Sequence, residues 1–225
     1  YEADGFFIWR NEALIKEVQR LRLHFDTVYK SRFDDSAEIN RNLIKRFADD
    51  PKVSALFSDP SISALVSELG IRIPVFCGPI VTHYTSNDAT GQAYGLPLHQ
   101  DWPSMGSSLN SLIIWFNLSD SSPSTHSIAV ARGMHKQGLL SGSQTEKGYV
   151  LDDTNVENLT VLDIRAGELL IMSSFLPHKT HVHSHASEWK LSLSRRIDDL
   201  SDAKWAERGY RNAYGNTVDR NLFMM

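Results

Sequence analysis

The sequence predicts an α+β fold, mainly β, in which N-terminal helices cover one sheet of a β-sandwich or barrel. Residues 1–70 carry apolar side chains at helical spacing, and from residue 72 onward short β-branched and aromatic runs are separated by Gly, Ser, Pro and Asp. A chain of 225 residues is long enough for one domain with a hydrophobic core of its own. We therefore expect a single domain over 1–225, with a helical part (1–70), a β core (71–200) and a C-terminal tail (201–225).

The predicted helices begin and end at residues suited to those positions. Asn11 is placed to cap a first helix, whose apolar face holds Leu14, Ile15, Val18, Leu21 and Phe25. A second helix has apolar residues four apart, at Ile39, Leu43 and Phe47. The Asp-Pro pairs at 50–51 and 59–60 each read as a cap followed by proline at the first helical position. Gly70 is suited to end the last helix.

The β region is expected to contain short strands separated by turns. The candidate strands are 72–85, 108–118, 127–131, 168–174 and 188–197. The segment 141–158 is polar and lacks apolar periodicity, so we expect a surface loop there.

Composition narrows the classes of partner. The net charge is -4 and no basic stripe is present, which argues against nucleic acid. No apolar run approaches the roughly 20 residues of a membrane span, and no signal peptide is visible, so we expect a cytoplasmic protein. The chain has one cysteine, Cys77, so no disulfide can form within it. The oligomeric state is left open.

The tripeptide His99-Gln100-Asp101 is the first candidate for chemistry. Residues two apart in a strand point to the same side, so this imidazole and carboxylate can bind one metal ion. With a second histidine from elsewhere, the set matches the two-histidine, one-carboxylate site of iron(II) oxygenases, which leaves positions open for a co-substrate and dioxygen. The tripeptide alone is a weak signal, and the alternative is a surface histidine beside a loop aspartate.

The residues that surround this tripeptide make the signal more specific. Trp115 lies in a β-rich run, and a turn follows at 132–136 (Arg-Gly-Met-His-Lys). A Gly-Glu pair at 167–168 then precedes an apolar strand, and His178 comes just past its end. Over residues 79–197 this order and spacing resemble the phytanoyl-CoA dioxygenase family of iron(II)/2-oxoglutarate oxygenases.

The resemblance implies a double-stranded β-helix, a jelly-roll of the cupin type. It also implies iron(II) bound by His99, Asp101 and His178, with 2-oxoglutarate and O2 as co-substrates. Trp115, Tyr84 and Thr180 would then lie near 2-oxoglutarate.

The chain departs from the family where an arginine should bind the far carboxylate of 2-oxoglutarate. Lys190 stands there, with Ser192 two residues on. Lysine offers a point charge where arginine offers a two-pronged match. Arg196 lies on the same strand face by two-residue alternation and is the alternative.

Other residues have more than one reading. His181, His183 and His185 share one face of a possible strand. They form a second metal site, or one of them replaces His178 as a ligand, or they line the barrel mouth or face solvent. We expect structural roles for His83, His126 and His135. Either substrate contact or simple packing is expected for Gln100, Trp102 and Met105.

The expected function is hydroxylation of a small-molecule metabolite or natural-product intermediate, with release of succinate and CO2. The alternatives are a same-fold oxygenase that catalyses desaturation, cyclisation or epimerisation, and a non-catalytic cupin-like module that binds a metal or ligand.

Overall fold

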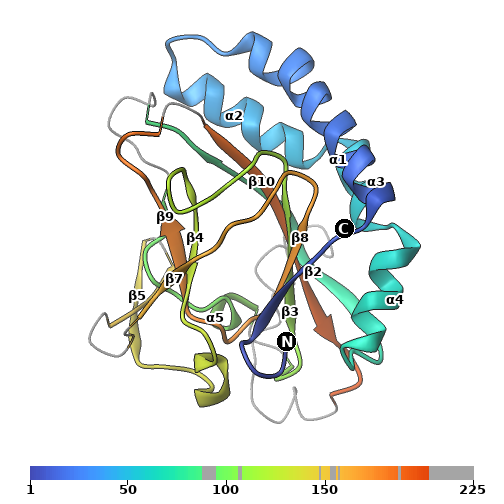
Figure 1. The fold of residues 1–225 in the computed structure, drawn as a ribbon, viewed down its shortest axis with the longest axis vertical. Coiled ribbons are helices and arrows are strands. Elements are labelled where there is room, and N and C mark those ends of the chain that lie inside the picture. Colours follow the sequence, from blue (N-terminus) through green and yellow to red (C-terminus); the bar gives the residue numbers. More distant parts are fainter. Residues whose placement is uncertain are drawn as a thin grey trace, which may run out of the picture.

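A computed structural model describes residues 1–87, 95–105, 108–146, 148–152, 156, 158–186 and 189–202. Two antiparallel sheets face each other, and the helices cover the outer side of the larger sheet (Figure 1). The α+β prediction of a jelly-roll with helices on one sheet is confirmed. Residues 203–225 of the predicted C-terminal tail, and residue 188 of the last predicted strand, lie outside the described residues.

The larger sheet has five strands in the order β1-β8-β3-β10-β2, all antiparallel. The strands are β1 (Phe6–Trp9), β2 (Pro74–Thr85), β3 (Leu112–Asn117), β8 (Leu169–Ser173) and β10 (Lys190–Asp199). Four of them match predicted strands. The helical prediction for the N-terminal part misses β1, because four consecutive apolar residues have neither a helical nor a strand period.

A bulge interrupts the pairing of β2 with β10. Ser194 is paired with Val81, whereas Arg196 is paired with Cys77, so β2 has two more residues than β10 at this point. The pairing of β10 with β3 continues without a shift through the same residues. The bulge therefore bends β2 while β10 keeps its regular alternation.

The smaller sheet has three strands in the order β7-β4-β9, and a two-stranded hairpin adjoins it. The three strands are β4 (Ser127–Val130), β7 (Thr160–Val161) and β9 (His178–His181), and the hairpin consists of β5 (Gly142–Thr145) and β6 (Gly148–Leu151). His99 bridges β9 and β6, opposite His178 and Val150. The prediction of a loop over 141–158 is wrong for the hairpin. The strands escaped notice because β5 is mostly exposed, β6 is mostly half-buried, and neither shows apolar alternation.

The helices begin where the caps predict. Asn11 accepts hydrogen bonds from two backbone N–H groups of the first helix, and Asp50 and Asp59 each accept one at the helices that begin at Pro51 and Pro60. Gly70 follows the last of these helices with a φ of 86°, which the missing side chain allows. The helices and helical turns are α1 (Glu12–His24), η1 (Phe25–Tyr29), η2 (Lys30–Arg32), α2 (Ala37–Ala48), α3 (Pro51–Phe57), α4 (Pro60–Glu68), α5 (Trp102–Met105) and η3 (Met134–Gln137).

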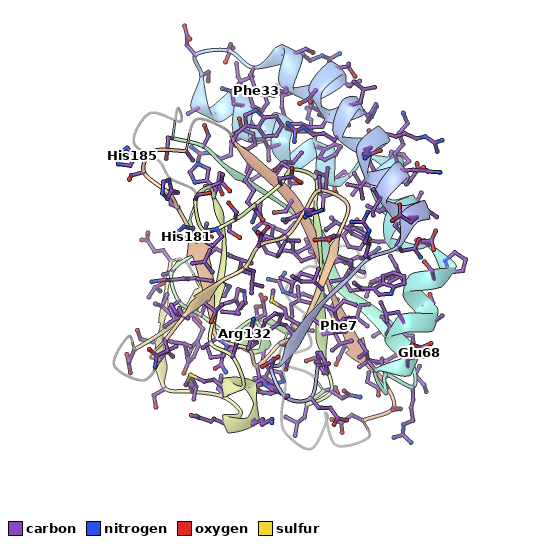
Figure 2. The ribbon with its side chains drawn as sticks, viewed as in Figure 1. Phe7, Phe33, Glu68, Arg132, His181 and His185 are labelled. Carbon is purple, nitrogen blue, oxygen red and sulfur yellow. The ribbon has the colours of Figure 1, made fainter. Side chains whose placement is uncertain are left out.

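The larger sheet is buried on both faces, which gives two apolar cores. Leu112, Ile114 and Phe116 pack against the helices, whereas Ile113 and Trp115 face the smaller sheet. Figure 2 shows Phe33 beneath the helices, and His181 and His185 on the side of the smaller sheet. Burial of each large apolar side chain contributes about 1.5–3 kcal/mol. Alternation along a strand therefore decides which residues reach the space between the sheets.

No helix in the described part of the chain combines the length and the apolar character needed to cross a membrane.

Candidate metal centre and adjoining cavity

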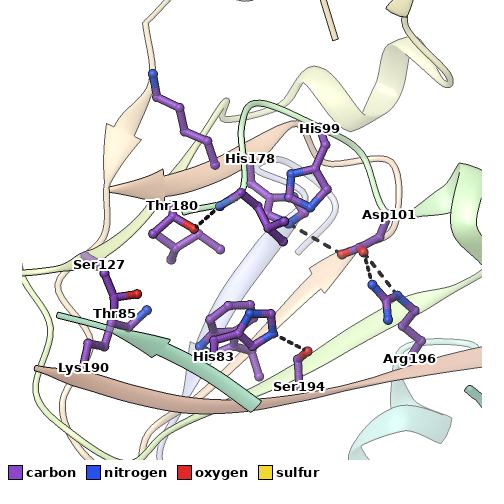
Figure 3. Close-up of a pocket in the computed structure, with 14 residues that line it drawn as sticks. His83, Thr85, His99, Asp101, Ser127, His178, Thr180, Lys190, Ser194 and Arg196 are labelled. Carbon is purple, nitrogen blue, oxygen red and sulfur yellow. Dashed lines mark hydrogen bonds and ion pairs between the residues drawn. The ribbon is translucent and has the colours of Figure 1, made fainter. Parts of the chain in front are cut away.

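His99, Asp101 and His178 converge between the two sheets (Figure 3). Their ligand atoms all lie within 4.8 Å of one another, and no other such group of three occurs among the described residues. The bridge between the backbones of His99 and His178 places the two imidazoles side by side, with ring centroids 4.2 Å apart. Asp101 lies two residues after His99, immediately before α5. The structure thus brings together the three residues predicted from sequence.

Each imidazole is held with one nitrogen free. His99 Nδ1 lies 2.8 Å from the Pro97 carbonyl oxygen, and His178 Nδ1 lies 2.9 Å from that of Leu176. A carbonyl only accepts, so each Nδ1 carries the proton and each Nε2 keeps its lone pair. Burial and the neighbouring His99 lower the pKa of His178 to about 4. Both features favour the neutral imidazole that ligates metals.

Asp101 is paired with Arg196 from β10. Arg196 Nη2 and Nε donate to the same oxygen, Asp101 Oδ1, at 2.6 and 3.2 Å. The other oxygen, Oδ2, lies 3.5 Å from His178 Nε2. Burial alone would raise the pKa of this carboxyl, but the charge of Arg196 and its hydrogen bonds hold that pKa well below its usual range. Asp101 is therefore a carboxylate with one oxygen turned toward both imidazoles.

A small cavity adjoins this centre. Both sheets and the segment before His99 line it. Besides the three candidate ligands, its walls include His83, Thr85, Leu96, Trp115, Ser127, Ile128, Thr180, Lys190, Ser194 and Arg196.

Lys190 is the unusual member of this lining. Its side chain is buried, and Nζ lies 4.9 Å from the ring centroid of Trp115. None of the ion pairs among the described residues includes it. Burial lowers the pKa of Lys190 to about 7. A buried ammonium without a carboxylate is unfavourable, so this position is suited to an anionic ligand.

Two further predicted co-substrate residues are Thr180, on β9 of the smaller sheet, and Ser192, on β10 with Lys190. Thr180 lines the cavity, and its Oγ1 accepts a hydrogen bond from the Leu96 N–H at 3.0 Å. Ser192 shares the inward face of β10 and is fully buried. Its Oγ has no hydrogen-bond partner among the described residues, so this hydroxyl is also available to a ligand.

Tyr84 lies outside the cavity, contrary to expectation. It packs against Trp189 and Phe33 on the helix side of the sheet, at centroid distances of 5.3 and 5.8 Å. Alternation along β2 turns its neighbour His83 inward instead. His83 stacks on Trp115 at 4.1 Å and shares a 2.8 Å hydrogen bond with Ser194 Oγ. Sequence reasoning missed His83, because the strand alternation was not applied to this stretch.

Gln100 does not line the cavity either. Its Nε2 donates to the Gly138 and Phe175 carbonyls at 2.8 and 2.6 Å, and its Oε1 accepts from the Leu140 N–H at 2.9 Å. Gln100 therefore joins the loop after η3 and the turn before His178 to the segment that carries two ligands.

Trp102 and Met105 have packing roles in the structure, and neither lines the cavity. Trp102 donates from Nε1 to the Ser108 carbonyl at 2.9 Å and stacks on Phe175 at 5.2 Å. Met105 is fully buried in the core between the sheets.

The row of histidines after the third ligand is spread out. The rings of His181, His183 and His185 are 6.2 and 6.0 Å apart in succession, and none of them belongs to the group of three that could hold a metal. His178 is the histidine of this run that pairs with His99.

No protein-family model matches the sequence, and a search of curated proteins also finds no match. Solved structures, by contrast, match over most of the chain. EctD from S. alaskensis, with 2-oxoglutarate and 5-hydroxyectoine, is 13% identical, with a TM-score of 0.65 over 89% of this chain and 74% of that one. EvdO2 from Micromonospora carbonacea var. aurantiaca, complexed with 2-oxoglutarate, is 16% identical, with a TM-score of 0.60 over 93% of each chain.

A third similar structure is SnoN from nogalamycin biosynthesis, a non-haem α-ketoglutarate-dependent epimerase. It is 14% identical, with a TM-score of 0.55 over 88% of this chain and 78% of that one. These identities are low, and the likeness is one of fold. The chain therefore has the fold of solved structures that hold iron, 2-oxoglutarate or both.

Proposed function

We propose that this chain is an iron(II)/2-oxoglutarate-dependent oxygenase of the phytanoyl-CoA dioxygenase type, which hydroxylates a small-molecule substrate. The observation that carries the proposal is the buried His99, Asp101 and His178 group beside a cavity that contains an unpaired lysine. The fold, shared with structures that hold iron and 2-oxoglutarate, supports it.

The ligand set fits iron(II). Two neutral imidazoles and one carboxylate would occupy half of an octahedral coordination sphere and leave the rest open. The carbonyls of Pro97 and Leu176 fix both ring orientations, and Arg196 fixes the carboxylate. When bound, iron(II) with 2-oxoglutarate and O2 would supply the oxidation of a C–H bond, with release of succinate and CO2.

The charge and the hydrogen-bonding groups around the cavity are suited to 2-oxoglutarate. Lys190 would bind the distal carboxylate, with Ser192 and Thr180 adding hydrogen bonds and Trp115 forming a wall. Arg196 is less suited to this task, because Asp101 already engages its Nε and Nη2. Leu96, Trp115 and Ile128, the apolar members of the lining, would limit the access of water and keep these charge interactions strong.

Turnover without a prime substrate tests the proposal. Protein loaded with iron(II) and given 2-oxoglutarate, O2 and ascorbate should release succinate slowly, and His99→Ala should abolish both iron binding and this release. His181→Ala, a histidine of the same run outside the group of three, is the matched control and should retain both. Succinate release that survives His99→Ala, or wild type that binds iron without any release, would overturn the proposal.

The same fold also carries an epimerase, so the outcome of the reaction needs its own measurement. Once a substrate is found, product masses distinguish hydroxylation, which adds one oxygen, from desaturation and cyclisation, which remove two hydrogens, and from epimerisation, which leaves the mass unchanged.

A further inference from the structure

His83 is a histidine of β2 whose side chain lines the cavity. Its ring stacks on Trp115, with centroids 4.1 Å apart and planes inclined by 23°. Trp115 is held in turn, because its Nε1 donates to Asn117 Oδ1 at 3.0 Å. On its other side, His83 Nε2 lies 2.8 Å from Ser194 Oγ. The stack and the hydrogen bond together fix the direction of the ring.

The other ring nitrogen of His83, Nδ1, is open to the cavity. Within the described part of the chain, Ser194 is the hydrogen-bond partner of this ring, through Nε2, and Nδ1 has none. Nδ1 is not one of the fully enclosed polar atoms that lack a partner, so solvent reaches it. The cavity is the open space beside the ring. A ligand in the cavity can therefore bond to Nδ1.

His83 is neutral and can present a donor. Burial, together with the charges of Lys190 and Arg196, lowers the pKa of His83 to about 3, so the ring carries one proton. A hydroxyl can donate as well as accept. When the Ser194 hydroxyl donates to Nε2, the proton of the ring lies on Nδ1 and faces the cavity. His83 then offers an N–H without adding a further positive charge beside Lys190 and Arg196.

The ring is held nearer to the metal centre than to the base of Lys190. Figure 3 shows His83 between Lys190 and Arg196, with its hydrogen bond to Ser194. Arg196, which binds Asp101, lies two residues beyond Ser194 on β10, and Lys190 lies four residues before it. At about 3.3 Å per residue, the backbone of Ser194 is roughly 7 Å from that of Arg196 and roughly 13 Å from that of Lys190. A ligand that extends from the metal to Lys190 therefore passes His83 close to its metal end.

We propose that His83 Nδ1–H donates to the 1-carboxylate of 2-oxoglutarate, at the oxygen that the metal leaves free. A 2-oxo acid that chelates a metal uses its keto oxygen and one carboxylate oxygen, so the second carboxylate oxygen needs a donor of its own. Lys190 then binds the distal carboxylate and His83 the proximal one. His83 favours 2-oxo acids in general, whereas Lys190 favours those with a second acid group. This inference rests on the proposed function.

Two substitutions test the donor. His83→Phe keeps an aromatic ring against Trp115 and removes both nitrogens. In His83→Asn the short amide reaches the position of Nδ1 and restores a donor there. Each variant is loaded with iron(II) without O2, and its Kd values for 2-oxoglutarate and 2-oxovalerate are measured by calorimetry. 2-Oxovalerate keeps the 1-carboxylate and has a methyl group in place of the distal carboxylate.

The loss of affinity should be the same for both ligands. Without a hydrogen bond to a charged group, both Kd values should rise about tenfold or more in His83→Phe, and their ratio should stay within about twofold of wild type. His83→Asn should bind both ligands about threefold or more tightly than His83→Phe does. Lys190→Met is the matched contrast, because it should weaken 2-oxoglutarate alone. Unchanged Kd values in His83→Phe, a rise for 2-oxoglutarate alone, or no recovery in His83→Asn would overturn the assignment.

A measurement on the unaltered chain does not depend on how the variants fold. In zinc-loaded protein labelled with ¹⁵N-histidine, either 2-oxo acid should leave the His83 proton on Nδ1 and shift its resonance downfield. A proton on Nε2 in the complex would contradict the proposal. If wild-type protein loaded with iron(II) binds neither 2-oxo acid, the proposed function fails. If it binds 2-oxoglutarate and His83→Phe binds it equally well, only the role of His83 fails.

Discussion

Lys190→Met is the most direct test of the co-substrate site, because methionine keeps the unbranched shape of the side chain and removes its charge. Lys190 is buried, and the described residues offer it no ion-pair partner. Removing one partner of a buried ion pair typically destabilises it by about 3–5 kcal/mol. At about 1.4 kcal/mol per factor of ten, the Kd for 2-oxoglutarate should rise by two orders of magnitude or more.

The same change should stabilise the protein in the absence of ligand, because it removes a buried charge without a partner. Calorimetry on iron(II)-loaded protein without O2 measures the Kd, and a thermal melt of the ligand-free protein measures Tm. Iron binding should be unaffected, since Lys190 is not among the candidate ligands. The reasoning fails if Lys190→Met binds 2-oxoglutarate as tightly as wild type, or if its Tm falls. Weakening by Arg196→Gln but not by Lys190→Met would assign the carboxylate to Arg196.

Three further predictions follow from the site. The pKa of Lys190 is about 7 without ligand and a bound carboxylate would raise it, so the affinity for 2-oxoglutarate should fall about tenfold per pH unit above 7. His83 and His126 have lowered pKa values and stay neutral in this range. A Kd that does not change with pH would contradict the assignment. Arg196→Gln should weaken cobalt(II) or iron(II) binding about 10–100-fold in a metal titration, and Arg196→Lys should recover part of the loss. In a ligand titration, Arg196→Gln should keep the preference for 2-oxoglutarate over 2-oxovalerate, which has a methyl group in place of the distal carboxylate. Gln100→Leu should lower the free energy of unfolding by about 2–4 kcal/mol, since it removes three hydrogen bonds. A change below about 0.5 kcal/mol in urea unfolding would mean that these hydrogen bonds are not needed to hold the loops together.

Features that depend on neighbours in the chain were predictable. The caps at Asn11, Asp50 and Asp59 follow from residue type and spacing, and the ligand pair of His99 and Asp101 follows from two-residue alternation. The same alternation turns Gln100, which lies between these two ligands, away from the metal.

Contacts between distant segments were not predictable from strand periods, and His178 was placed beside His99 only through the family resemblance. The partner of Arg196 comes from 95 residues earlier in the chain, and the stack of His83 on Trp115 joins two strands that β10 separates. A single sequence carries the period of each strand but not the register between strands, so these contacts had to come from the structure.

The bulge in β2 limits which insertions this fold can accept. Because the bulge adds two residues, Cys77 before it and His83 and Thr85 after it all face the space between the sheets. An insertion of one residue at the same place would turn every later side chain of β2 over, moving Tyr84 into the cavity and His83 under the helices. Length changes in the strands of this sheet should therefore persist in pairs of residues, while the connecting loops remain free to change by one.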